Sequence, residues 1–100
     1  MSVALLQGLQ EWYLAQCAGD WEHSFGVTIG TLDNPGWTLS VDLTDTDLES
    51  EPFEELTEDY EDKSGWMICR KTGAKFEAAG GPEKLEDMVR VFLRWAASAA

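Results

Sequence analysis

Residues 25–43 read FGVTIGTLDNPGWTLSVDL, two alternating stretches on either side of a turn. Apolar side chains occupy every second position before and after the central DNPG, which is typical of half-buried β-strands. Asp or Asn at the start of a tight turn accepts backbone hydrogen bonds, Pro35 fixes φ for the next position, and Gly36 tolerates a positive φ. The stretch therefore predicts an antiparallel hairpin with strands at 25–32 and 37–43.

A helix is expected on each side of the strand region. In the first, Ser2 is a candidate N-cap and Gly19 a left-handed terminating residue. In the last, Pro82 stands at the first turn and Glu83 near the positive end of the helix dipole. Both segments carry apolar residues at the spacing of one buried helix face. These stripes are Leu5, Leu6, Leu9, Trp12 and Tyr13, and Leu85, Met88, Val89, Phe92, Trp95 and Ala96.

Three further strands complete the expected sheet. We expect a short, acid-rich edge strand within 53–60, a central strand that begins at 66–69 because its residues are apolar on both faces, and a return strand at 75–79. Residues 44–52 are expected to form a polar connection. The predicted class is α+β: an antiparallel sheet of four to five strands with both helices packed on one face. Phe25, Val27, Ile29, Leu39 and Val41 are expected to be buried beside Leu9, Trp12, Met88, Phe92 and Trp95.

The length of 100 residues fits a single domain spanning 1–100, and 44% hydrophobic residues is a globular composition. The N-terminal region lacks the basic and apolar pattern of a secretory signal, and no apolar run reaches the ~20 residues of a membrane span. We therefore expect a cytoplasmic protein, as monomer or weak homodimer, without membrane contact. Cys17 and Cys69 are then expected to be reduced, buried thiols rather than a disulfide.

The net charge of −12 is concentrated in one segment. Residues 42–62 hold eleven acids and no Lys or Arg, whereas the rest of the chain holds eight acids and seven bases. Such a field repels nucleic acid and anionic membranes and attracts a basic partner. Composition alone leaves two interpretations open: a solvated surface that keeps the protein soluble, or a docking surface for a cationic protein.

Several motifs together resemble the immunity protein 53 family of bacterial polymorphic toxin systems. They are CAGDWEH at 17–23, TLDNPGW at 31–37, Trp12-Tyr13, Trp66-x-x-Cys69, Phe76 before Gly80, and Phe92-Leu93-x-Trp95. The resemblance implies a small cytoplasmic antidote that binds and silences a toxin, with no catalytic residues of its own. It favours docking as the role of the acidic run, with a basic nuclease as one suitable toxin because its active site is built to hold phosphate.

The candidate toxin-binding residues come from the acidic run and from the block before the hairpin. Trp21 and Trp37 border turns, where a tryptophan serves either as core packing or as a binding hot spot. The full set is Trp21, Glu22, His23, Trp37, Asp42, Asp45, Asp47, Glu49, Glu51, Glu54, Glu55, Glu58 and Asp59.

The alternative functions are a small enzyme centred on Cys17 and His23, or a generic acidic adaptor or nucleic-acid mimic. A nucleophile needs a base and an orienting group, and the sequence does not supply the full set. We therefore expect no catalytic site, no metal site and no cofactor, because the spacing of zinc ligands and of phosphate-binding loops is also missing. Asp20 and His23 are instead expected to satisfy backbone groups between the first helix and the sheet.

Overall fold

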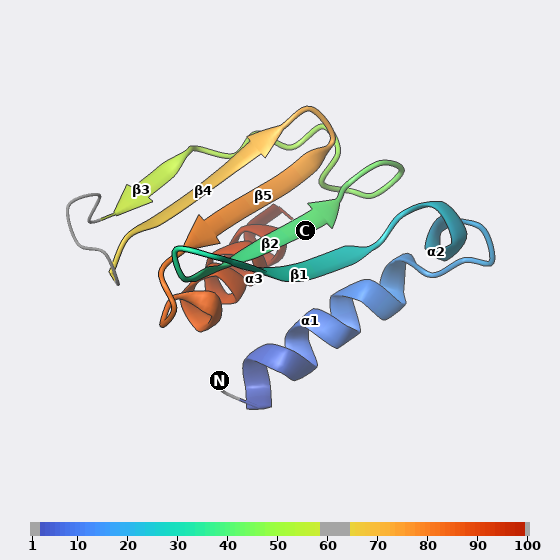
Figure 1. The fold of residues 1–100 in the computed structure, drawn as a ribbon. Coiled ribbons are helices and arrows are strands. Elements are labelled where there is room, and N and C mark those ends of the chain that lie inside the picture. Colours follow the sequence, from blue (N-terminus) through green and yellow to red (C-terminus); the bar gives the residue numbers. More distant parts are fainter. Residues whose placement is uncertain (1–2, 59–64, 100) are drawn as a thin grey trace.

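The computed structural model describes residues 3–58 and 65–99, which form a five-stranded antiparallel sheet and three helices (Figure 1). The order of strands across the sheet is β1-β2-β5-β4-β3. The predicted α+β class is confirmed. The elements are α1 (Val3–Gln16), α2 (Trp21–Ser24), β1 (Val27–Leu32), β2 (Gly36–Asp42), β3 (Leu56–Glu58), β4 (Met67–Thr72), β5 (Lys75–Gly80) and α3 (Leu85–Ala99).

The predicted hairpin forms in the predicted register. β1 and β2 pair antiparallel with Ile29 opposite Leu39, and the side chains of Leu39 and Val41 are fully buried. A register shifted by one residue would have turned both side chains toward solvent. The hairpin therefore places the inner face of β2 at the centre of the core.

The reason given for Gly36 was wrong. Among the described glycines only Gly19 and Gly73 have a positive φ, so Gly36 is not needed for a left-handed turn position. A Cβ atom on Gly36 would instead collide with the carbonyl oxygen of Gly80 on the neighbouring strand. Glycine is required here because two backbones approach closely. The left-handed conformation predicted for Gly19 is confirmed by its φ of +93°.

The two long helices cover the same face of the sheet. α3 packs against β2, β5 and β4, and α1 lies beside α3 (Figure 1). A Cβ atom on Gly8 would lie 2.9 Å from Leu93 Cδ1, so this glycine allows the two helices to approach closely. Of the residues expected in the core, Leu9, Met88 and Phe92 are buried. Trp12 and Trp95 on the helices, Phe25 before β1 and Val27 at its start are only partly buried.

The expectation that Ile29 is buried was wrong. Its side chain is 39% exposed because β1 is an edge strand and α3 lies under the middle of the sheet. The expected acid-rich edge strand is β3, but it spans only Leu56–Glu58; the part of that prediction at residues 59–60, like Ser2, lies outside the described residues.

The strand expected at 66–69 is β4; it lies between β5 and β3, so the prediction of an inner strand is confirmed. Met67 and Cys69 are buried against the helix layer, whereas Ile68 is half-buried on the other face. In the described part of the chain no helix packs on that second face. The apolar run therefore reflects a central position in the sheet rather than burial on both sides.

Candidate binding surface

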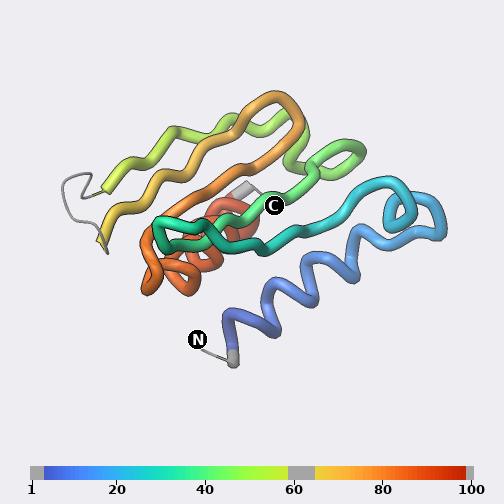
Figure 2. Tube along the Cα trace, viewed as in Figure 1, coloured from blue at the N-terminus to red at the C-terminus, as the bar shows by residue number. Residues whose placement is uncertain are grey.

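The turn of helix α2 is fixed to the loop that follows β2. Trp21 is buried, and its indole Nε1 donates a hydrogen bond of 2.8 Å to the carbonyl oxygen of Thr44. Its ring also meets Trp12 and Tyr13 of α1 at centroid separations of 6.1 and 6.0 Å. Trp21 thus packs inside the protein and holds α2 beside the loop, which Figure 2 shows as neighbouring light-blue and green turns.

The backbone before α2 is satisfied by Glu22, and the expectation that Asp20 and His23 do so was wrong. One carboxylate oxygen of Glu22 accepts from Ala18 N at 2.9 Å, and the other accepts from Gly19 N at 2.9 Å. Asp20 is the N-cap residue but makes no capping hydrogen bond with its side chain. The N–H groups of Glu22 itself and of Ala18 and Gly19 lower the pKa of the Glu22 carboxyl below its usual range. A Glu three positions after a helix-ending glycine was the available sequence signal.

The connection between β2 and β3 is an ordered loop with buried apolar residues, rather than the purely polar connection that was expected. Leu43 and Leu48 are buried in the core, at 0% and 3% exposure. Thr46 Oγ1 donates to the Leu43 carbonyl oxygen at 2.7 Å, and Glu49 Oε1 accepts from Asp45 N at 3.0 Å. Two apolar anchors and two local hydrogen bonds fix the path of the backbone between them.

Side chains from distant elements hold the second half of this loop. Lys71 of β4 donates from Nζ to the carbonyl oxygens of Glu49 at 2.6 Å and Glu51 at 2.7 Å. Trp95 of α3 donates from Nε1 to the Pro52 carbonyl oxygen at 2.9 Å. These contacts were missed by sequence reasoning because each joins residues 20 or more positions apart.

The acids of this segment fall into two groups. Asp42 is partly buried: its Oδ2 accepts from Gly26 N at 3.0 Å, and its Oδ1 lies 3.7 Å from Lys75 Nζ. Glu51 is also partly buried, and Asp59 lies outside the described residues. The exposed group, which presents carboxylates to solvent from a fixed backbone, is Asp45, Asp47, Glu49, Glu54, Glu55 and Glu58.

The structure brings Asp45 of the acidic run beside α2 at one end of the sheet, whereas Glu58 lies on β3 at the opposite edge and near the other end. A hollow of about 380 Å³ lies between α2 and the loop after β2. Trp21 and Asp20 line one side of it and Asp45 the other. We define the acidic surface as α2 together with the exposed acids of residues 45–58. His23 is exposed on α2 and belongs to this surface.

Trp37 lies apart from the acidic surface near α2. It stands at the start of β2, whereas Asp42 ends the same strand. Its ring is half-buried against the core, and its Nε1 donates to the Pro82 carbonyl oxygen at 3.0 Å. Trp37 shares a register row across the sheet with Gly80, Met67 and Glu58, and the acid in this row, Glu58, lies three strands away.

The residues considered for enzyme chemistry are not assembled into a site. The Cys17 thiol, which is half-buried rather than buried, contacts the Tyr13 carbonyl oxygen at 3.4 Å, and within residues 3–58 and 65–99 no hydrogen bond joins Cys17 to His23. Both cysteines are free, as expected. Burial, and secondarily the charge of Glu58, raises the pKa of the Cys69 thiol to about 12. No group of three or more His, Cys, Asp or Glu side chains in the described residues is placed to hold a metal ion.

These features define a small α+β protein with a carboxylate-rich surface, in whose described residues no hydrogen bond joins Cys17 to His23. The family model described as Immunity protein 53 matches residues 6–97, and the chain therefore belongs to this family of immunity proteins. Comparison with curated proteins and with solved structures gives no match. None of the described helices has the length and apolar character needed to cross a membrane.

Proposed function

We propose that this immunity protein neutralises a basic toxin by docking its acidic surface over the toxin's active site. The main observation that supports this proposal is that side chains of other elements hold the loop between β2 and β3 in place. Lys71 and Trp95 hold the loop backbone, and Trp21 holds α2 against it. Carboxylates on a fixed backbone lose little conformational freedom on binding, which leaves more of the interaction free energy for affinity.

The charge distribution supports a cationic partner. The described acids at 45, 47, 49, 54, 55 and 58 are all exposed, and residues 42–62 contain no Lys or Arg. Charge of one sign on one surface steers an oppositely charged protein into place and speeds association. A nuclease that holds phosphate with Lys and Arg has the complementary surface. Such a toxin meets this protein inside the cytoplasm of the producing cell.

Inhibition in this proposal is occlusion rather than chemistry. The exposed acids occupy the place of the substrate's phosphates, and Glu22 and His23 at α2 extend the contact. We propose that the immunity protein acts as a monomer or weak homodimer and contacts neither nucleic acid nor membrane. It needs no cofactor for this role.

The test uses the toxin domain encoded beside the gene for this chain. Association and dissociation rates are measured by surface plasmon resonance between about 50 and about 300 mM salt, where screening changes the reach of exposed charges. The variants are Glu54→Gln, Glu55→Gln and the two combined. Glu11→Gln is the matched control, because it removes one exposed charge from α1.

We expect the double variant to associate severalfold more slowly at low salt, with a smaller change in dissociation. The control should bind like the wild type. Toxin inhibition that is indifferent both to salt and to these substitutions would locate the interface elsewhere. A toxin that does not bind the wild-type chain would contradict the proposed function itself.

A further inference from the structure

Within the described residues no strand pairs with the outer edge of β1, and the backbone groups that face this edge come from every second residue. Asp42 N donates to the Gly26 carbonyl oxygen at 3.0 Å, which identifies residues 26 and 42 as a hydrogen-bonded pair. In an antiparallel ladder such pairs recur at every second residue. The N–H and C=O groups of Val27, Ile29 and Thr31 therefore point away from β2, toward the free edge of the sheet.

This edge lacks the features that usually block strand addition. Natural edge strands are short, charged, bulged or interrupted by proline. β1 has six residues, VTIGTL, without a charge or a proline, and all six pair in regular register with β2. The opposite edge of the sheet, β3, has three residues within the described part of the chain and carries the charge of Glu58. β1 is thus the edge that is open to a further strand.

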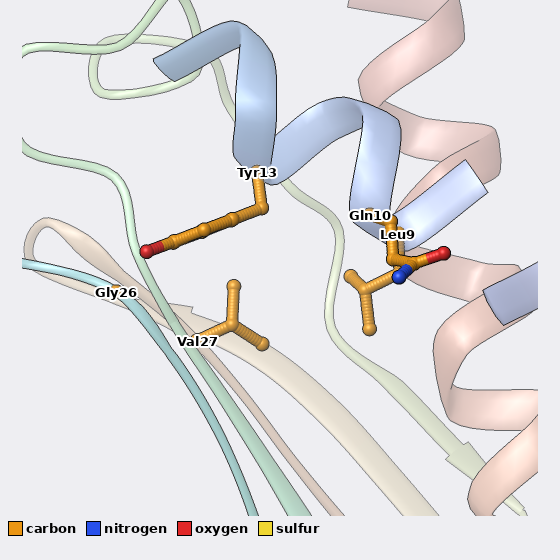
Figure 3. Close-up of a pocket in the computed structure, with 5 residues that line it drawn as sticks. All are labelled: Leu9, Gln10, Tyr13, Gly26 and Val27. Carbon is orange, nitrogen blue, oxygen red and sulfur yellow. The ribbon is translucent and has the colours of Figure 1, made fainter. Parts of the chain in front are cut away.

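An apolar groove runs beside this edge, between α1 and β1 (Figure 3). It has a volume of about 300 Å³ and is lined by Leu9, Gln10 and Tyr13 of α1 and by Gly26 and Val27. Tyr13, which lines the groove, is 38% exposed. Further along the same two elements, Leu6 of α1 is 43% exposed and Ile29 of β1 is 39% exposed. A strand added to β1 would place every second side chain over this groove.

The charges around β1 indicate what kind of strand fits. Asp33 follows one end of β1, and Asp20 and Asp45 lie beside Phe25 at the other end. Two copies of the chain paired antiparallel about Ile29 would bring Asp33 of each copy to Phe25 of the other, beside Asp45. With −12 on each chain, this arrangement places like charges together. A strand from a basic partner meets the same carboxylates with opposite charge.

We infer that β1 pairs antiparallel with an extended segment of the toxin that is apolar at alternate positions and carries Lys or Arg at its ends. This inference rests on the proposed function and adds a binding mode to it. Phe25 lines the hollow beside α2, and the next residue, Gly26, lines the groove beside β1, so one bound segment can contact both. Backbone hydrogen bonds to the edge supply affinity, and the groove and flanking acids supply selectivity.

The test removes a donor from each edge of the sheet in turn. Ile29→Pro deletes an N–H that faces outward, so the bonds between β1 and β2 remain. Thr57→Pro is the matched control: Gly81 N donates to the Trp66 carbonyl oxygen, and the alternation from that pair turns the Thr57 backbone away from β4. Ile29→Lys keeps the N–H but adds a charge to the same edge. Thermal unfolding confirms that each variant is folded.

With the toxin domain from the same locus, we expect Ile29→Pro and Ile29→Lys each to weaken binding by roughly tenfold or more, and Thr57→Pro to change it less than about twofold. Amide hydrogen exchange at Val27, Ile29 and Thr31 should slow on binding, while exchange at Thr57 should not.

If wild-type and folded Ile29→Pro proteins bind the toxin equally and these amides stay unprotected, the inference is wrong and the proposed function stands. Loss of a homodimer in Ile29→Pro with unchanged toxin affinity would assign the edge to a second copy and also overturn it. If the wild-type protein does not bind the toxin, both the proposed function and the pairing of β1 with the toxin are wrong.

Discussion

The indole nitrogen of Trp21 lies 2.8 Å from the carbonyl oxygen of Thr44, across 23 positions of sequence. This hydrogen bond joins the short helix α2 to the start of the loop between β2 and β3. It makes the α2 turn and the loop one surface. The ring that donates it is only 6% exposed, so its contribution to binding is to position neighbours.

Replacing this donor should loosen the surface. We expect Trp21→Phe to lower the free energy of unfolding by about 1–3 kcal/mol, because a partly buried carbonyl oxygen loses its partner and core volume is lost. Toxin association should slow at the same time. Urea unfolding and binding rates measure the two effects. Trp37→Phe removes a comparable indole bond at the other end of β2; equal losses of affinity in both variants would mean that the interface reaches Trp37.

Substitution of Lys71 distinguishes the effect of net charge on binding from the effect of a fixed loop backbone. Lys71→Met makes the chain more acidic, so charge alone predicts tighter binding to a basic toxin. Loss of the bonds to Glu49 O and Glu51 O predicts the opposite, together with a loss of about 1–2 kcal/mol in stability. We expect weaker binding. Lys75→Met makes the same charge change at an exposed lysine that pairs with the partly buried Asp42, and it should tighten binding slightly.

Local pattern was sufficient to predict the hairpin but not its position in the sheet. Alternation fixed which side of β2 faces inward, as the burial of Leu39 and Val41 shows. Nothing in the alternation distinguishes a central from an edge strand, and Ile29 is exposed for that reason. Similarly, the identity of Gly36 was informative, but its physical cause, contact with Gly80, depends on a strand that lies more than 40 positions later.

The sequence was sufficient to predict that the candidate surface is acidic, but not that its backbone forms an ordered loop. Leu48 is the one apolar residue among the acids of 44–51, and its burial is what could have revealed a folded loop. The anchors Lys71 and Trp95 could not have been found, because side-chain donors to loop carbonyls leave no sequence pattern. Whether the candidate residues bind a toxin stays a prediction.

The two cysteines should differ sharply in reactivity. The thiolate is the reactive form, and Cys69 is buried with its pKa raised to about 12. Cys17 is only partly buried. We expect a disulfide reagent at about pH 8 to modify Cys17 in the native protein and Cys69 only after denaturation. Cys17→Ser should abolish the native reaction and leave toxin binding intact; lost inhibition in that variant would instead support the enzyme alternative.

Glu22 should make the stability of the protein depend on pH through its bonds to Ala18 N and Gly19 N. Its folded-state pKa is lowered, first by its own N–H and then by the N–H of Ala18. The ionised carboxylate therefore stabilises the fold above the unfolded-state pKa of about 4.3, and this contribution is lost as the pH falls through the lower folded-state value. Glu22→Gln should lower the urea midpoint at about pH 7, and the gap to the wild type should close toward about pH 3. Glu11→Gln, an exposed acid on α1, serves as the control with little gap at either pH. A gap for Glu22→Gln that stays constant across this range would show that the charge of the carboxylate does not hold the turn.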